Sequence, residues 1–311
     1  MPTTRLLFVH ALSPLHAGTG QGTDIIDLPI AREKATGIPY LPGSSVKGTL
    51  RDGFNIPGDP QSEEVQQARA KQWAIFGPDT NNADAFGGSV QFGDARLLLL
   101  PVRSLAGTFA WVTSPYLLQR FKREAAIVGF KDLPEPPKPQ TQGDVQGCVI
   151  IGNSALVVDG IDKVILEDLD LAYSKSPELM LWAQQLSHWL FEGDDDAKEW
   201  SLILSKRLCV VSDDVLSFLL ITATEVFARV KLLEDTKTVQ KGGLWYEEAL
   251  PSETILTSIV VVQPVASERR KALNETQIIN ELTAATQRAL QFGGKATVGR
   301  GLCRVRLAGG A

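Results

Sequence analysis

The amino-acid sequence predicts an α+β fold in which strands and helices interleave. Two observations support this prediction. Apolar stretches typical of strands alternate with segments that carry helix-capping signals. Some of these stretches also follow one another closely enough to form hairpins. The mixture favours a ferredoxin-like core with insertions over a regular parallel strand–helix array.

Six stretches have the composition of strands. The first, residues 5–12, is a short apolar run that leads through Ser13-Pro14 into a loop with glycines at positions 18, 20 and 22. The others, in chain order, are residues 89–100, 148–158, 207–211, 255–262 and 303–307.

Four helices are predicted from their capping residues. Serine before a helix accepts the first free amides, and proline at the next position needs no donor. Carboxylates in the first turn suit the positive end of the helix dipole. The helices are expected from Ser114-Pro115 to about Gly129, from Ser176-Pro177 to Gly193, from Ser212-Asp213-Asp214 through Val226-Phe227, and from about Thr276 to Leu290 before Gly293-Gly294.

The composition is that of a folded globular protein. The chain has 311 residues, of which 44% are hydrophobic and 22% charged, and this argues against wholesale disorder. We find no internal repeat and no clean domain boundary. A single domain over residues 1–311 with insertions is therefore predicted. The proline-rich segment 134–139 is expected to be a surface loop.

The sequence shows no membrane signal and no disulfide framework. No apolar run reaches the length of a membrane span, and residues 1–10 do not resemble a secretion signal. We therefore expect a cytoplasmic protein with no membrane partner. The cysteines Cys148, Cys209 and Cys303 are odd in number and form no CxxC pair, so they are predicted to be core residues rather than zinc ligands.

The charge of the chain is unevenly distributed. A net charge of −5 lowers the expectation of nucleic-acid binding, which depends on neutralising phosphates. From Arg288 to the C-terminus, however, five cations occur without a carboxylate, whereas acid is concentrated at residues 193–196 and 247–248. This asymmetry could present a basic face to an anionic partner, although a solvated charge run is the ordinary alternative.

A glycine-rich loop and the helix expected after it have the features of a phosphate-binding surface. The glycines within residues 16–33 let backbone amides approach phosphate oxygens. Ser44 and Ser45, at the start of a short predicted helix, would offer donors beside Lys47 and Arg51. The alternative is a capped helix with exposed cations. A nucleotide-binding P-loop is excluded because the lysine and the GxxxxGK[ST] spacing are missing.

Asp27 and His16 are the candidate catalytic residues of this loop. Asp27 lies between apolar pairs, where a carboxylate needs a partner or an opening to solvent. From the residues alone, Asp27 could equally form a turn or an ion pair, and His16 could be a satisfied, partly buried histidine.

The segment 292–301 is a second candidate phosphate-binding loop. Gly293 and Gly294 would permit close backbone approach, and Lys295, Thr297 and Arg300 would offer donors and positive charge. A tight glycine connection between two elements is the alternative interpretation.

Taken together, these stretches resemble the RAMP superfamily of CRISPR proteins. The segments that carry the resemblance are 16–20, 27–33, 42–48 and 293–301. Segments 101–116, 212–214 and 243–248 are, in order, similar to the backbone subunits of type III-B Cmr effector complexes. The resemblance spans most of the chain.

The resemblance implies an RNA-recognition fold with an inserted lid and thumb. Such subunits stack on one another as a filament along a CRISPR guide RNA, together with other Cmr subunits, and each thumb disturbs the duplex formed with target RNA at regular intervals. The loop aspartate that matches Asp27 is associated in this family with cleavage of target RNA that depends on a divalent metal, Mg²⁺ or Mn²⁺. Attack by the RNA's own 2′-hydroxyl needs in-line alignment and a proton acceptor or metal ligand.

Three functions follow as hypotheses. In the first, the chain is an endoribonuclease in which Asp27 binds the metal or accepts the proton, helped by His16 and Glu247. In the second, it only binds guide RNA, and Asp27 shapes the loop. In the third, it processes guide RNA alone; the Cmr-like segments argue against this.

Residues 233–248 are predicted to form the thumb. The stretch 233–243 alternates polar and β-branched residues without an apolar face, and the glycines at 242 and 243 are expected to make the turn of a protruding hairpin. The returning strand would carry Glu247 and Glu248 toward Asp27. A mobile surface loop is the alternative.

Overall fold

The computed structural model describes residues 2–20, 26–55, 57–78, 87–263 and 273–309. Gly22, one of the glycines in the predicted loop, lies outside these residues. The helices are α1 (Gly43–Asp52), α2 (Glu63–Phe76), α3 (Pro115–Val128), α4 (Pro177–Phe191), α5 (Ala197–Arg207), α6 (Asp213–Thr222), α7 (Glu275–Ala285) and the 3-10 helix η2 (Ala296–Val298). The strands are β1 (Thr3–Ala11), β2 (Tyr40–Leu41), β3 (Val90–Phe92), β4 (Ala95–Arg103), β5 (Phe109–Thr113), β6 (Gly147–Ile150), β7 (Val157–Val158), β8 (Lys163–Leu166), β9 (Leu169–Lys175), β10 (Leu208–Val211), β11 (Glu225–Leu232), β12 (Val239–Ala249), β13 (Ile255–Val262), β14 (Leu290–Gln291) and β15 (Leu302–Ala308).

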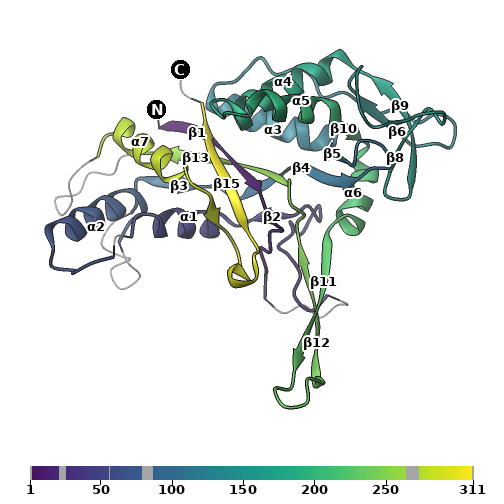
Figure 1. Ribbon diagram of the computed structural model, residues 1–311. Coiled ribbons are helices and arrows are strands. Elements are labelled where there is room, and N and C mark those ends of the chain that lie inside the picture. The colour runs from purple at the N-terminus through teal and green to yellow at the C-terminus, as the bar shows by residue number, and fades with distance from the viewer. Residues whose placement is uncertain (1, 21–25, 56, 79–86, 264–272, 310–311) are drawn as a thin grey trace.

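A long mixed sheet forms the centre of the molecule (Figure 1). Its strands follow the order β14-β15-β1-β13-β4-β5-β10-β6-β9-β8-β7, with β2 beside β4 and β3 beside β13. The strands from β15 to β5 pair antiparallel, whereas β5 with β10 and β6 with β9 pair parallel. The predicted mixture of strands and helices is thus confirmed. The ferredoxin-like core stays a prediction.

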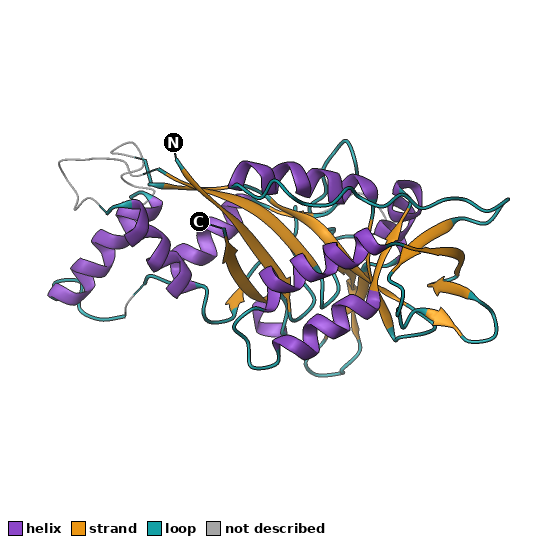
Figure 2. Ribbon diagram, turned by 90° about the horizontal axis from the view of Figure 1, so that it is seen from above, coloured by secondary structure: helices purple, strands orange, loops and turns teal. Residues whose placement is uncertain are grey.

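Helices cover both faces of this sheet (Figure 2). Side chains alternate along β1, because successive residues of a strand point to opposite faces. Leu6 and Phe8 pack in one core with α3, α4 and α5, and Leu7 and Val9 pack in another with α1, α6 and α7. The three cysteines are buried and unpaired, as predicted. No described helix is long and apolar enough to cross a membrane.

The predicted helix starts are correct, but two predicted helix ends are wrong. Ser114, Ser176 and Ser212 each accept a bond from the backbone amide three residues on. Helix α6 stops at Thr222, so Val226-Phe227 belong to β11 instead. Helix α7 stops at Ala285, and Leu290 lies in β14. In both cases a strand begins within a few residues of the helix, and its pairing with a later strand of the chain outweighs local helix propensity.

Two predicted strands are interrupted. The stretch 89–100 is split into β3 and β4, and 148–158 into β6 and β7. Gly93 causes the first break, because its amide and carbonyl are bonded to Ile259 and Ser258 in a close backbone approach. Helices α2 and α5 and strands β5, β8 and β9 were not predicted.

Strands β11 and β12 form a separate hairpin that projects from the body of the molecule (Figure 1). Its turn lies at residues 233–238, where the Leu233 amide donates to the Thr238 carbonyl at 2.9 Å. The prediction of a turn at Gly242 and Gly243 is wrong. These glycines lie within β12, where the pairing register shifts, and Gly242 has a φ of 73°.

The hairpin has an exposed apolar face, built by residues on either side of the stretch 233–243, which was predicted to lack such a face. Val226, Val230 and Leu232 point to the same side of β11 and are exposed. Leu244 lies opposite Val230 and is exposed as well. The prediction missed this face because three of these four residues come from β11, of which Val226-Phe227 were assigned to a helix and residues 228–232 to no element.

Candidate functional site at the base of the hairpin

The loop that carries Asp27 lies against the inner end of β12. Leu28 forms a parallel bridge with Glu247: its amide donates to the Tyr246 carbonyl at 3.1 Å, and its carbonyl accepts from the Glu248 amide at 3.0 Å. Asp27 is exposed, and its Oδ2 accepts the Tyr246 amide at 2.8 Å. The pairing therefore holds an exposed carboxylate at the point where the hairpin leaves the body.

His16 is buried beside the same strand. Its Nδ1 lies 2.6 Å from the Glu248 carbonyl oxygen, and because a carbonyl only accepts, Nδ1 carries the proton. A Cβ on Gly18 would lie 2.6 Å from His16 Nε2. The Gly294 amide donates to the His16 carbonyl at 3.0 Å, and Gly293, with a φ of 70°, approaches the same carbonyl. His16 thus joins three segments of backbone.

Glu247 is buried and surrounded by donors. Its carboxylate accepts from Trp245 Nε1 at 2.8 Å and Arg229 Nε at 3.2 Å, and Lys295 Nζ lies at 2.8 Å. Burial by itself raises the pKa of Glu247, but the bonds from Lys295, Trp245 and Arg229 together outweigh it and lower the pKa to about 2. Glu247 is therefore a stable anion whose oxygens are already occupied by partners within the chain.

The C-terminal loop docks on the hairpin through its cations. Lys295 pairs with Glu247, and the Arg300 guanidinium lies 3.5 Å from the centre of the Phe227 ring. Thr297 is exposed in η2. Two of the cations predicted to contact RNA thus also have partners within the chain.

The N-terminus of α1 differs from the predicted phosphate cradle. Pro42, not a serine, is the capping position, and no side chain caps it. The first helical amide, that of Gly43, donates to Asp94 Oδ1 at 2.8 Å, so a carboxylate of the chain itself occupies this helix end. Ser44 is exposed and Ser45 partly buried, so Ser44 in particular is accessible to a partner.

Helix α1 and the C-terminal loop lie side by side. Thr49 Oγ1 donates to the Gln291 carbonyl at 3.1 Å. Lys47 is partly exposed on α1, and Arg51 Nη1 donates to the Pro78 carbonyl at 3.2 Å. The structure therefore brings the two predicted phosphate-binding loops next to each other, with the hairpin base beside the second.

The described residues contain no group of three or more His, Cys, Asp or Glu side chains that could hold a metal ion by themselves. Of the predicted site residues, only Asp27 has an exposed carboxylate. This fits a hard divalent ion held by one carboxylate together with phosphate oxygens of RNA, a mode that Mg²⁺ uses with nucleic acids and nucleotides. The residues present thus fit Mg²⁺ or Mn²⁺ only in company with a substrate.

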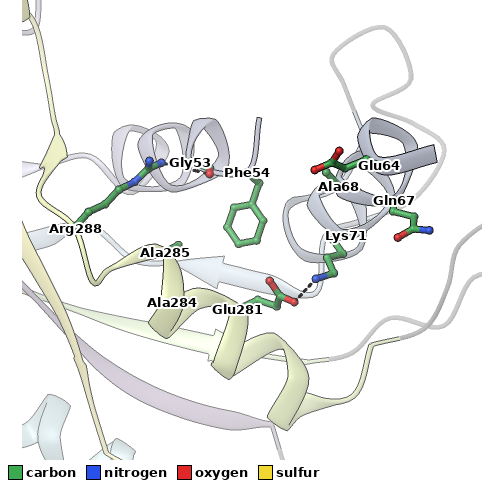
Figure 3. Close-up of a pocket in the computed structure, with 10 residues that line it drawn as sticks. All are labelled: Gly53, Phe54, Glu64, Gln67, Ala68, Lys71, Glu281, Ala284, Ala285 and Arg288. Atoms are coloured by element: carbon green, nitrogen blue, oxygen red, sulfur yellow. Dashed lines mark hydrogen bonds and ion pairs between the residues drawn. The ribbon is translucent and has the colours of Figure 1, made fainter. Parts of the chain in front are cut away.

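A pocket of about 490 Å³ lies between α1, α2 and α7 (Figure 3). Phe54 points into it, and Lys71 and Glu281 form an ion pair of 2.6 Å across it. Its lining includes none of the predicted site residues. The pocket therefore belongs to another part of the surface than Asp27.

Sequence reasoning missed the residues that hold this site together. Arg229 was missed because β11 was not predicted as a strand, although the alternation from Val226 to Leu232 is typical of one. Arg32 was noted only as part of a motif, yet it pairs with the buried Glu248 at 2.5 Å. No local pattern points to a pair that is more than two hundred residues apart in the chain.

Similarity to known proteins extends over nearly the whole chain. The model of the RAMP superfamily matches residues 8–304. The CRISPR system Cmr endoribonuclease Cmr4 of Pyrococcus furiosus is 34% identical over 302 residues, which cover 97% of this chain and 95% of that protein. The crystal structure of oligomeric Cmr4 from Pyrococcus furiosus aligns with a TM-score of 0.72 at 28% identity and covers 100% of both chains. A chain of the type III-B Cmr-beta complex bound to cognate target RNA aligns with a TM-score of 0.70 at 20% identity, over 98% of this chain and 96% of that one, and so shares the fold.

Proposed function

We propose a function for this chain, which belongs to the RAMP superfamily. The chain is a repeating guide-RNA-binding backbone subunit of a type III-B CRISPR effector complex. We further propose that it is an endoribonuclease that cleaves complementary target RNA at regular intervals. Its partners would be guide RNA, target RNA, further copies of itself and other Cmr subunits. The predicted cytoplasmic location stays a prediction.

The observation that carries the proposal is the exposed carboxylate of Asp27 at the base of the hairpin. An exposed carboxylate can meet a 2′-hydroxyl or a phosphate, whereas the neighbouring Glu247 is already engaged by three donors. Tyr246 holds Asp27 by its amide, which does not neutralise the negative charge. A relative 34% identical over 97% of this chain bears the name endoribonuclease.

The main contribution of the protein to this reaction is to place the reacting groups of the RNA correctly. The RNA supplies its own nucleophile, so the chain must hold the 2′-hydroxyl in line with the phosphorus and accept a proton or hold a cation. A bound Mg²⁺ or Mn²⁺ would stabilise the negative charge that develops on the phosphate. Asp27 serves as the residue that holds the ion or takes the proton, and His16 and Glu247 keep the surrounding backbone in place.

The test is the reconstituted complex with wild-type chain or with Asp27→Asn, incubated with guide and complementary RNA. Asparagine keeps an oxygen that can accept the Tyr246 amide, so the loop keeps its shape while the charge is lost. We expect guide binding and assembly to persist and target cutting to stop. Undiminished cutting by the variant would remove Asp27 from the chemistry.

A purely structural guide-binding subunit is the second candidate. The bond between Asp27 and the Tyr246 amide favours it, because a residue that only shapes the loop would make this contact. If the wild-type complex binds guide and target but cuts neither, this second function holds.

A further inference from the structure

We propose that Glu248 is a positioning residue that couples the hairpin to the Asp27 loop, so that the two move as one unit. The inference rests on the proposed function, since it concerns how Asp27 is held for RNA cleavage. Glu248 is 3% exposed and lies two residues beyond the amide that Asp27 accepts. Its side chain therefore joins the same short stretch of β12 to its surroundings.

The Glu248 carboxylate is bonded at both oxygens. Oε1 accepts from Arg32 Nη2 at 2.5 Å and from Thr224 Oγ1 at 2.9 Å, and Oε2 accepts the Ile30 amide at 3.1 Å. Ile30 and Arg32 follow Asp27 in the loop. Glu248 itself lies in β12, and Thr224 leads into β11. One buried carboxylate thus connects the loop to both strands of the hairpin.

Arg32 extends the connection to α6. Its Nη2 also donates to the Leu220 carbonyl at 2.9 Å, near the end of the helix, and its Nη1 donates to the Gly37 carbonyl at 3.0 Å. A cation is favourable at a helix C-terminus because the last carbonyls lack partners within the helix. The hairpin, the loop and α6 are therefore held together by one ion pair.

Loss of the negative charge at position 248 would leave the Arg32 guanidinium without its ion-pair partner. Removing one partner of a buried ion pair is strongly unfavourable. The Arg32 side chain would therefore move toward solvent, and the loop would shift with it. Glutamine has the shape of glutamate, but one of its two ends is a donor. That end would face Arg32 and Thr224 or the Ile30 amide, which are donors as well.

The coupling has a consequence for cleavage. When RNA or a neighbouring molecule displaces the hairpin, β12 moves as part of it. Ile30 and Arg32 then move too, because both are bonded to Glu248 in β12. Asp27 would follow the hairpin and keep its position relative to the RNA that the hairpin touches. A misplacement of about 1 Å can reduce a rate roughly 100-fold, so such coupling has a measurable effect.

The experiment compares wild type, Glu248→Gln, Thr224→Val and Asp27→Asn in reconstituted complexes. Thr224→Val removes only the hydroxyl that bonds Glu248 and is the milder change if Glu248→Gln assembles poorly. Asp194→Asn is the matched control, because Asp194 is a largely buried carboxylate that pairs with Arg304 and Arg306 away from the loop. Target affinity, the single-turnover cutting rate at saturating target, and amide hydrogen exchange of residues 26–32 are measured.

We expect Glu248→Gln to lower the single-turnover rate roughly 100-fold with target affinity unchanged. Exchange of residues 26–32 should become faster, while exchange of β1 and β13 stays as in wild type. Thr224→Val should change the rate and the exchange in the same direction by less, and Asp194→Asn should leave both as in wild type.

Two results would overturn the inference: a wild-type rate in Glu248→Gln, or a slowed rate with unchanged exchange in residues 26–32. Failure of the proposed function looks different. In that case the wild-type complex does not cut, or Asp27→Asn cuts as wild type does. The exchange measurement needs no cutting and therefore tests the coupling in either case.

Discussion

Asp27 and Glu247 both lie at the base of the hairpin, yet their surroundings give the two carboxylates different properties. Asp27 is exposed and bonded to one backbone amide. Glu247 is buried and bonded to Trp245, Arg229 and Lys295. Only Asp27 can meet a substrate without first breaking ion pairs. Glu247 is therefore better suited to holding the hairpin on the body than to exchanging a proton.

The low pKa of Glu247 predicts a contribution to stability that depends on pH. A carboxylate whose folded pKa is below its unfolded value stabilises the fold fully above the unfolded pKa and loses this contribution as pH falls through the folded pKa. For Glu247 the window runs from the ordinary value of 4.5 down to about 2. The contribution is on the order of 3 kcal/mol. Denaturant unfolding of wild type and Glu247→Gln at a series of pH values should show a stability difference that shrinks across this window; a constant difference would contradict the assignment.

Gly293 and Gly299 offer a matched pair of substitutions in the C-terminal loop. Both have positive φ, 70° and 79°, so alanine costs about 1 kcal/mol or more at either position. A Cβ on Gly293 would also lie 2.2 Å from the His16 carbonyl oxygen, whereas one on Gly299 meets open space. We expect Gly293→Ala to lower the free energy of unfolding clearly more than Gly299→Ala. Equal losses would show that the contact with His16 is not tight.

At the scale of elements, the position of the site depends on the hairpin. A two-stranded hairpin is marginally stable by itself, so β11 and β12 depend on the contacts at their base. These contacts are Glu247 with Lys295, Arg300 with Phe227, and Glu248 with Arg32. The outer part has no such anchors among the described residues, and its exposed apolar face suits contact with RNA or with another protein chain.

Shortening the hairpin tests whether it is the thumb that sets the cutting positions. Val230 and Leu244 are cross-strand partners, so residues 231–243 can be replaced by an Asn-Gly turn without altering the base. We expect guide affinity to persist and regular cutting to be lost, because an undistorted A-form duplex does not reach in-line geometry.

The control for the shortened hairpin replaces residues 234–237 with glycine and serine at unchanged length. This control should cut target RNA as wild type does. Cleavage products are mapped on one long target, and an unaltered product ladder from the shortened chain would contradict the thumb assignment.

At the scale of the whole molecule, α1 and the C-terminal loop lie together despite their distance in the sequence. Lys47, Arg51, Lys295 and Arg300 would form one basic surface for the guide backbone in a chain whose net charge is −5. The surface is local, so it can attract phosphates even though the molecule as a whole is acidic.

Neutralising these four cations should weaken guide binding about equally for unrelated sequences. For every cation that no longer binds a phosphate, the slope of log affinity against log salt should fall by roughly one unit. Lys295→Ala should in addition slow cutting, because Lys295 pairs with Glu247. Lys47→Ala should leave the cutting rate of bound target unchanged. Weaker binding of particular guide sequences only would instead indicate base readout.

Much of the local structure follows from the sequence. Serine caps located the starts of α3, α4 and α6, and apolar runs located β1, β10, β13 and β15. The motif around Asp27 marked the loop that the structure brings to the hairpin. These features depend on neighbouring residues, because capping bonds, proline geometry and side-chain alternation act over a few positions.

The tertiary structure alone decided how the distant parts of the site combine. Glu247 and Glu248 occur as an ordinary acidic pair in the sequence, and only the pairing of β12 with Leu28 and β11 makes one an anchor for Lys295 and the other an anchor for Arg32. The position of the turn likewise depended on the register between β11 and β12. The pairing of Leu28 with Glu247 joins segments more than two hundred residues apart, and no local pattern in the sequence contains that information.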